Sequence, residues 1–344
     1  MDKNAIVQRV WDLCDKQQEQ GQGQEQEQEQ EQEQEKAPRL LMDTRFPTQF
    51  VSPYTNVSNQ LTVRTAEMIE KAIQNGEDPE IEFSSPAKVQ GAKDHVIVTY
   101  DGNGEVTLSS KIDEYDRAVH DAVCSCFEAG QKQFTDRMIY RGMNRNKRPG
   151  GKSKRLKTIN SSIGKMRSYV INISAAVAIY GDDVKLKSYG ANMLTLKHYV
   201  VTVRGKETTV YEFVEEPILL QYAKDRNCLI RVDNKVMDIP LDMTPQRIVI
   251  RNYLIRTIVG MTGRKVTNRT VNFDTLFENC SIKKDQHAYL HKNFVIKVLE
   301  YWKSIEWHID SHEEIKSKSD NGIVGVKVIL IKDKEKDNEK KGEE

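Results

Sequence analysis

The chain has 344 residues, 38% of them apolar, and a formal net charge of only +1, which is enough apolar material to bury the cores of two ordinary domains. No apolar run approaches the roughly 18 residues of a membrane-spanning helix and the N-terminus lacks a signal-peptide core, so we expect a soluble cytoplasmic protein that enters no membrane. The five cysteines are odd in number and form no CxxC pair, which argues against a disulfide framework and a zinc finger.

Both ends of the chain have the composition of solvated tails. Residues 17–36 are a Gln/Glu repeat without an apolar side chain, so we interpret residues 1–40 as an N-terminal segment that contains a disordered tract. An alternative is that the repeat is an acidic decoy, which competes with DNA for the basic segment described below. The mixed charges of residues 333–344 predict a second disordered tail.

The first organised part begins near residue 95. The runs HVIVTY and EVTLSS flank the turn signal DGNG, a pattern that predicts a β-hairpin. Residues 113–130 then have apolar side chains at helical spacing, with Gly130 placed to end the helix. The apolar positions are Tyr115, Val119, Ala122, Val123 and Cys126. This spacing turns Cys124 away from the core, and it favours packing over metal binding for the pair Cys124 and Cys126.

Two further helices and a set of strands follow. Thr135 is a candidate N-cap for a short helix, and the spacing of Ile159, Ile163 and Met166 predicts a longer one. The runs MLTLKHYVVTV and TTVYEFV predict a hairpin, and PILLQYAKDRN predicts a short helix. Helix, short helix, basic loop, helix and strands is the order of a winged helix, a helix-turn-helix with a β wing. We expect this first winged-helix domain to span residues 95–225.

The loop of this domain is strongly basic. Residues 141–157, RGMNRNKRPGGKSKRLK, contain eight Lys or Arg and no acidic residue, and residues 137–167 contain eleven and again none. Clustered positive charge of this kind is typical of a surface that binds a polyanion, and the N–H groups at a helix N-terminus also favour phosphate. The alternative is a solvated loop, but solvated faces usually mix both signs. The candidate DNA contacts here are Arg141, Arg145, Lys147, Arg148, Lys152, Lys154, Arg155 and Lys157, with Ser161, Lys165 and Ser168 on the outward side of the following helix.

The same order repeats in residues 228–332, which we expect to form a second winged-helix domain. LIRVDNKVMDIPL predicts a small hairpin, and Thr244 with Pro245 predicts the start of a long helix. That helix would bury Ile250, Leu254, Ile258 and Met261 and end at Gly263. VNFDTLFENC predicts a short helix, residues 285–307 a third, and WHID with GIVGVKVILIK a second wing.

The third helix of this domain has two different faces. The core face would consist of Leu290, Phe294, Val298, Tyr301 and Ile305, with Trp302 at its edge. The other face has Gln286 at the helix start, followed by Tyr289, Lys292, Asn293, Ile296 and Lys303. Gln, Asn and Lys side chains can pair with base edges in a major groove. Asp285 and Glu300 interrupt the positive charge, so a merely solvated face is the alternative.

Two motifs of other function classes are incomplete. GGKS at residues 150–153 lacks the first glycine of a phosphate-binding loop, because that position is Asn146. His287 and His291 are spaced i, i+4, but HAYLH lacks the glutamate of a metalloprotease helix and a third ligand. We therefore expect neither a metal nor another cofactor.

A resemblance joins these observations. The runs YDRAVHDAVCSCFEAGQKQFTDRMIYRGM, SIGKMRSYVINIS, IPLDMTPQRIVIRNYLIRTI, NFDTLFENC and FVIKVLEYWKSIEW resemble the replication initiators of bacterial plasmids that bind repeated sites called iterons. The likeness spans roughly residues 95–332, and the Gln/Glu tract has no counterpart in it. It implies an α+β fold of tandem winged-helix domains with flanking hairpins, origin binding, recruitment of host replication proteins, repression of its own gene and possible homodimers.

Three functions stay open at this point. The first is a non-enzymatic, DNA-binding initiator, and the second is a winged-helix transcriptional regulator. Direct repeats beside an AT-rich segment near the gene would favour the initiator, whereas a lone promoter palindrome would favour the regulator. The third is a nicking enzyme with a tyrosine nucleophile and a His-bound metal, which needs a closely spaced histidine pair on a strand. None of the seven histidines has that setting. Which of the two domains dominates binding is also open.

Overall fold

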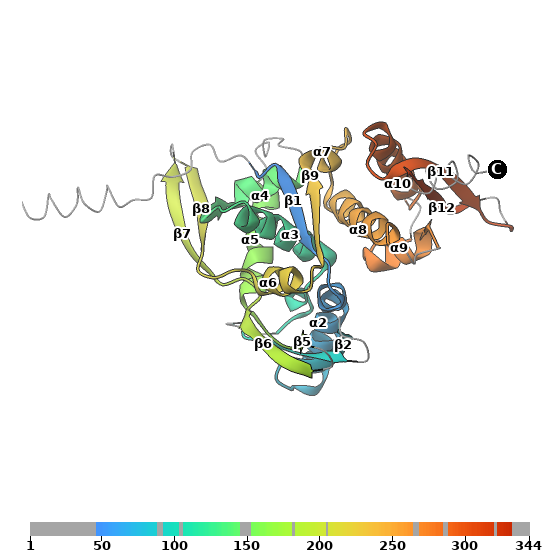
Figure 1. Ribbon diagram of the computed structural model, residues 1–344. Helices are drawn as coiled ribbons and strands as arrows, with labels where there is room; N and C mark the ends of the chain where they lie inside the picture. Colours follow the sequence, from blue (N-terminus) through green and yellow to red (C-terminus); the bar gives the residue numbers. More distant parts are fainter. Residues whose placement is uncertain are drawn as a thin grey trace, which may run out of the picture. The chain divides into compact units, whose positions relative to one another are not determined.

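The computed structural model describes residues 46–87, 92–102, 106–144, 153–180, 183–203, 206–263, 268–284, 288–319 and 322–331. This part of the chain combines helices with antiparallel strands, so the fold is α+β, with the described strands in four separate sheets (Figure 1). Residues 45–344 form one compact unit. Among the described residues, no helix combines the length and the apolar character that crossing a bilayer requires.

A four-stranded sheet includes residues that precede position 95. Its order is β2 (Glu80–Pro86), β3 (Lys93–Tyr100), β5 (Tyr169–Tyr180) and β6 (Asp183–Asn192), all antiparallel. The helix α2 (Asn56–Asn75) packs beside β2 and ends at Gly76, whose φ of 67° suits a glycine. This sheet therefore extends the first part of the molecule beyond the expected boundary at residue 95.

The hairpin expected around DGNG does not form. β3 pairs with β2 and β5 instead, which buries Val96 and Val98, and the second run folds as the short 3₁₀ helix η1 (Leu108–Ser110). A turn signal reports only local preference, whereas the strand partners come from other parts of the chain. The prediction of a hairpin at residues 95–110 was wrong for this reason.

The helix α3 (Glu114–Glu128) is the central helix of the fold. Asp113 and Asp116 form a capping box at its start, and Gly130 follows its end with a φ of 76°. The strand β1 (Gln49–Pro53), the helix α5 (Ser153–Arg167) and the helix α8 (Pro245–Met261) all pack against α3. Because these neighbours surround it, Cys124 is as fully buried as Cys126, and the prediction that Cys124 points away from the core was wrong.

Around α3 lies a first helix and sheet unit, which we call unit A. It runs α3, β4 (Gln133–Thr135), α4 (Asp136–Met143), α5, β7 (Leu196–Val203) and β8 (Lys206–Phe213), with β5 and β6 inserted before β7. Its sheet has the order β4-β8-β7. Thr135 caps α4 by accepting a hydrogen bond from the Met138 amide, and Ile159, Ile163 and Met166 of α5 are buried, both as predicted.

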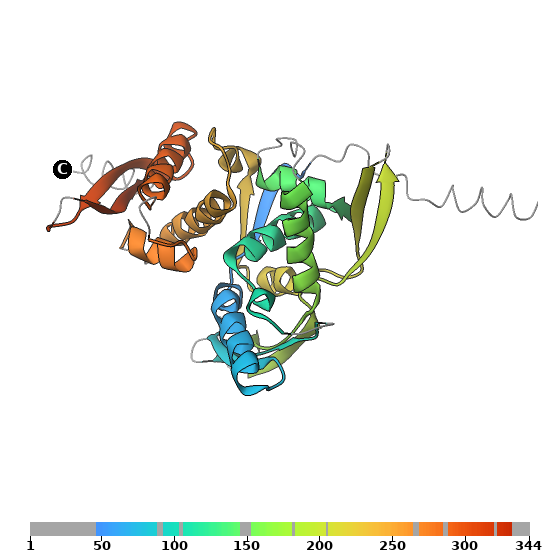
Figure 2. The ribbon, with the colours of Figure 1, turned by 180° about the vertical axis from the view of Figure 1, so that it is seen from behind.

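A second unit, which we call unit B, repeats this order. It runs α8, β10 (Thr270–Asn272), α9 (Phe273–Asn279), α10 (Ala288–Ser304), β11 (Ile309–Lys316) and β12 (Ile323–Leu330). Its sheet has the order β10-β12-β11, so first, third and second strands lie side by side as in unit A. Figures 1 and 2 show the hairpin of each unit, β7 with β8 and β11 with β12, from two sides. Thr244 caps α8 and Pro245 occupies its first turn, as the sequence predicted.

The segment that joins the units differs from its prediction. After the helix α6 (Ile218–Asp225), β9 (Leu229–Asp233) pairs antiparallel with β1, and the one-turn helix α7 (Asn234–Met237) follows. The expected hairpin in LIRVDNKVMDIPL is therefore absent. The β1–β9 pair crosses the expected domain boundary near residue 225, because its two strands come from opposite sides of that boundary.

Candidate nucleic-acid interface

The exposed side of α5 presents cations next to the basic segment. Lys154, Lys157 and Ser161 are exposed at i, i+3 and i+7, while Ile159 and Ile163 point into the core. This spacing puts the three polar side chains on one side of the helix. Lysines on a solvent-facing helix can contact phosphates, and the serine hydroxyl can contact a base edge or a phosphate.

Lys165 is not on that side. Its Nζ donates hydrogen bonds to Asp116 Oδ2 at 2.6 Å and to the Lys111 carbonyl at 2.9 Å, and its side chain is only 15% exposed. Burial raises the pKa of Asp116, and the negative charge of Asp113 raises it further. The ammonium of Lys165 opposes this shift, because its positive charge stabilises the Asp116 carboxylate. The prediction that Lys165 faces outward was wrong, because it ties α5 to the start of α3.

The other predicted residues of unit A lie in different settings. Arg155 is half-buried and donates from Nη1 to the Tyr140 hydroxyl at 3.0 Å, which links α5 to α4. Arg141 and Ser168 are also half-buried, and Ser168 donates to the Gly164 carbonyl at 3.4 Å. Arg145, Lys147, Arg148 and Lys152 lie outside the described residues, as does Gln286 of unit B.

One contact beside α5 had no signal in the sequence. Arg167 at the end of α5 donates from Nη1 to His198 Nδ1 on β7, at 2.8 Å. Both groups are near the base of the β7–β8 hairpin, and Lys197 beside them is exposed. Arg167 and His198 are far apart in the chain, so only the tertiary structure could reveal that the hairpin starts next to the basic helix.

In unit B, α10 is rotated relative to the prediction. Its buried residues are Phe294, Val295, Val298, Leu299 and Trp302. Trp302 is 0% exposed and donates from Nε1 to the Val236 carbonyl of α7 at 2.9 Å. Leu290 is 41% exposed, so its assignment to the core was wrong. The contacts with α7 help to set the rotation of the helix, and hydropathy alone could not supply them.

The exposed side of α10 retains two of the predicted base contacts. Tyr289 is 56% exposed and Asn293 is exposed beside it, one turn further along the helix. Lys292 is instead half-buried. Its Nζ donates to the Ile323 carbonyl at 2.7 Å and lies 5.6 Å from the centre of the Phe273 ring. Lys292 therefore holds α10 against β12, and its prediction as a residue of the open face was wrong.

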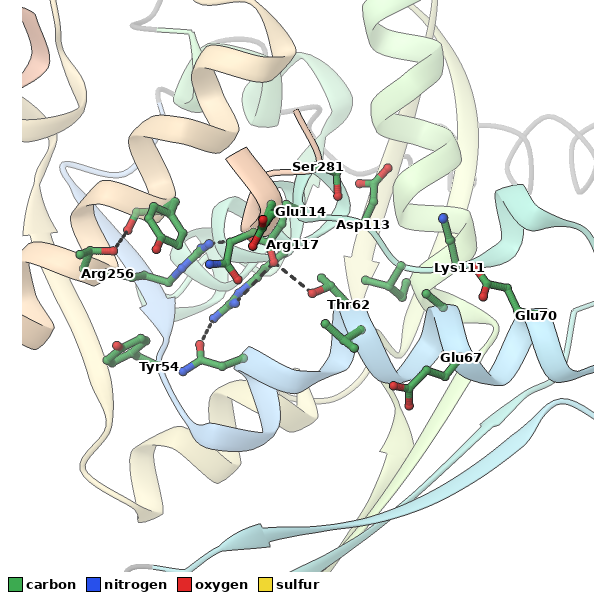
Figure 3. Close-up of a pocket in the computed structure, with 18 residues that line it drawn as sticks. Tyr54, Thr62, Glu67, Glu70, Lys111, Asp113, Glu114, Arg117, Arg256 and Ser281 are labelled. Carbon is green, nitrogen blue, oxygen red and sulfur yellow. Dashed lines mark hydrogen bonds and ion pairs between the residues drawn. The ribbon is translucent and has the colours of Figure 1, made fainter. Parts of the chain in front are cut away.

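A polar cleft of about 610 Å³ lies where α2, α3, α8 and α9 meet (Figure 3). In its depth, Glu114 accepts from Arg256 Nη2 at 2.7 Å and from Thr62 Oγ1 at 3.1 Å. Arg117 donates to Asn59 Oδ1 at 2.5 Å. Burial, together with the charge of Arg256, lowers the pKa of Arg117 to about 10.

This cleft is unsuited to a phosphate backbone. Its rim carries the carboxylates of Glu67, Glu70, Asp113 and Glu278, against the single lysine Lys111. The two deep arginines already face Glu114, and Arg256 also approaches Asp121 at 3.5 Å. The cleft lining includes none of the residues predicted to contact DNA, so the predicted contacts on α5 and α10 lie outside it. Among the described residues, no group of three His, Cys, Asp or Glu has the arrangement of a metal site.

Comparisons with known proteins give little further information. No family model matches the chain, and no curated protein matches it. A crystal structure of domains 2 and 3 of the protein RctB is similar over 73% of this chain and 90% of that chain, with 10% identical residues and a TM-score of 0.33. A similarity at this level supports no conclusion about fold or function.

Proposed function

We propose that the chain is a non-enzymatic initiator of plasmid replication that binds double-stranded DNA at repeated origin sites through two winged-helix units, unit A and unit B. Two features support the architecture. Each unit has the order helix, strand, helix, helix and hairpin, and in each sheet the strands run first, third, second. This is the order of elements of a helix-turn-helix with a β wing.

The observation that carries DNA binding is the one-sided charge of α5 and the segment before it. Residues 137–167 contain eleven basic residues and no acidic one, and Lys154 and Lys157 are exposed on the same side of α5. The rest of the chain compensates this charge, so the asymmetry is local. A surface of this kind neutralises phosphates and releases their counterions, which gives affinity for any duplex.

Unit B supplies the proposed discrimination between sequences. Asn293 can pair with adenine in a major groove, and Tyr289 can contact a base edge or a phosphate from the same side of α10. Lys297 is exposed further along the helix, but Glu300 follows it, so unit B attracts phosphate less strongly than unit A. Repression of the chain's own gene, pairing into dimers and recruitment of host replication proteins complete the proposed role.

A salt titration of the wild-type protein tests this proposal. A duplex that carries repeats from the DNA beside the gene should be bound more tightly than a scrambled duplex. The logarithm of the affinity should fall steeply with the logarithm of the salt concentration. Equal binding to both duplexes, or binding that does not depend on salt, would contradict it. A lone palindrome in place of repeats would favour the transcriptional regulator.

A pair of double variants tests the surface itself. Lys154→Ala/Lys157→Ala should flatten the salt slope by about one unit for each lost contact on cognate and scrambled duplexes alike. Lys93→Ala/Lys132→Ala removes the same charge from exposed positions outside residues 137–167, and should leave the slope unchanged. Equal slopes for the two double variants would place the phosphate contacts elsewhere.

A further inference from the structure

Arg251 of α8 is a buried cation that is bonded to neutral oxygens. It is 0% exposed and is among the largest fully buried side chains of the described residues. Its Nη1 donates to the Met143 carbonyl at 3.2 Å and to the Met237 carbonyl at 3.3 Å. Its Nε and Nη2 donate to Asn252 Oδ1 at 3.2 and 3.1 Å.

This arrangement is costly for the fold. Burial lowers the pKa of Arg251 to about 9, and the negative charge of Asp238 opposes the shift only in part. A buried charge is expensive even with good hydrogen bonds, and an apolar side chain of similar volume often serves stability as well or better. The presence of a guanidinium here therefore calls for a role other than stability.

The two carbonyls that Arg251 contacts end helices in different parts of the chain. Met143 is the last residue of α4 in unit A, and Met237 is the last residue of α7 beside unit B. The free carbonyls at a helix C-terminus carry partial negative charge, which a cation stabilises. One guanidinium from unit B therefore holds the end of a helix in unit A.

The end of α4 is also where the chain enters the basic segment. α4 ends at Met143, and α5, with exposed Lys154 and Lys157, begins at Ser153. The hydrogen bond from Arg155 of α5 to the Tyr140 hydroxyl of α4 also links these two helices. If the last turn of α4 moved, the start of α5 would move with it, and the phosphate contacts proposed for that surface would lose their spacing.

We propose that Arg251 is a positioning residue through which unit B holds the last turn of α4 in unit A, and through it the start of α5, in the arrangement that binds DNA. Arg251 contacts no DNA itself, because it is buried. The positioning is a property of the fold, and its effect on affinity rests on the proposed function. Because Arg251 joins α8 of unit B to the end of α4 in unit A, it would fix the two units relative to each other when both bind one duplex.

Hydrogen exchange in the full-length protein tests the positioning without DNA. Arg251→Met should speed amide exchange in the last turn of α4 and the first turn of α5, with little change in α9 and α10. Arg251→Lys keeps a cation with three donors, and should restore most of the protection. Arg247→Met is the matched control. Arg247 lies on the same helix but contacts Asp242 and Phe294 rather than unit A, so the exchange of α4 and α5 should stay unchanged.

Binding measurements then test the consequence. Circular dichroism first establishes a temperature at which all variants are folded. There, Arg251→Met should bind cognate and scrambled duplexes about tenfold more weakly, with a shallower salt slope, as expected for the loss of one or two phosphate contacts. Arg251→Lys should lie within about threefold of the wild type, because it keeps the charge at the same carbonyls.

The outcomes separate the two proposals. Local exchange changes in a protein that binds no DNA would refute the proposed function and support the positioning. DNA binding by the wild type, with exchange and affinity unaltered in a folded Arg251→Met, would overturn the positioning alone. If Arg251→Met does not fold, Arg251→Gln decides, because it keeps a polar side chain without the positive charge: exchange unchanged at α4 and α5 and an unchanged salt slope in that variant would overturn the proposal.

Discussion

Units A and B share one order of elements but expose different side chains on the helix before their hairpins. α5 of unit A exposes Lys154 and Lys157 within a stretch free of acidic residues, whereas α10 of unit B exposes Tyr289 and Asn293 beside charges of both signs. Phosphate contacts give affinity without sequence information, and base contacts give the information. Under the proposed function, α5 would therefore contribute affinity through phosphates and α10 discrimination through bases.

The units also differ in how they are built into the molecule. Unit A carries the inserted strands β5 and β6, which join β2 and β3 in the four-stranded sheet, and its central helix α3 is surrounded. Unit B packs against unit A through α8 and α3, with apolar side chains of both units in one core. Two arginines of α8, Arg251 and Arg256, add polar contacts across this junction.

The largest expected effect comes from breaking the charge contact between the units. Arg256→Ala removes the partner of Glu114 and Asp121, which are both buried. Asp121 then loses its arginine, and Glu114 keeps only the more distant Arg117 at 3.7 Å. Removal of one partner of a buried pair is strongly destabilising, so the free energy of unfolding should fall by about 3–5 kcal/mol. Urea denaturation measures it. Arg231→Ala, which loses an exposed pair with Glu128, should cost less than about 1 kcal/mol.

Similar losses for these two variants would show that α8 and α3 are held by apolar packing alone. In that case units A and B would be joined by their shared core, and the buried charges would have no part in the junction.

A smaller effect should separate the tasks of the two units. Tyr289→Ala/Asn293→Ala should weaken binding to the preferred duplex by about 1–3 kcal/mol for each specific pair, and change binding to a scrambled duplex much less. Ser304→Ala alters an exposed residue at the far end of α10 and serves as the control. Competition titrations at fixed salt measure both. Full discrimination by the first variant would mean that α10 is a solvated face, and base recognition would move to Ser161 of unit A.

The smallest effect concerns the acid stability of the joining segment. Burial alone would raise the pKa of Glu128, but hydrogen bonds from Lys224 and Arg231, at 2.6 and 2.7 Å, lower it below its ordinary value. A lowered folded-state pKa means that the contribution is fully present above the unfolded pKa and is lost as the pH falls through the folded pKa.

Glu128→Gln should therefore cost less than about 1 kcal/mol at pH 7, because the pair is partly exposed. The difference from the wild type should vanish below the ordinary carboxyl range near 4.5. Denaturation at a series of pH values measures it. A difference that persists unchanged into strong acid would show that Glu128 acts by packing rather than by charge.

The sequence by itself determined the features that depend on near neighbours. The N-caps Thr135 and Thr244, the helix-ending Gly130 and the buried spacing of Ile159, Ile163 and Met166 were all predicted, because caps and periodicity act within a few residues. The order of the helices in both units and the hairpin at the end of each unit followed from local sequence patterns, whereas the short strands β4 and β10 did not. The basic segment was also predicted, since charge is a property of composition.

Only the tertiary structure decided which partners meet across the chain. β3 pairs with β2 and β9 with β1 in place of two local hairpins, Lys165 turns inward to Asp116, and α10 rotates until Trp302 reaches the carbonyl of Val236. Each outcome depends on a group that is distant in sequence, and strand pairing and burial respond to such neighbours more than to local preference. A buried carboxylate requires a cation, and a buried indole N–H requires an acceptor. Lys165, which the sequence predicted to contact DNA, therefore pairs with Asp116, and Trp302, which the sequence placed at the edge of the core, is buried against the Val236 carbonyl.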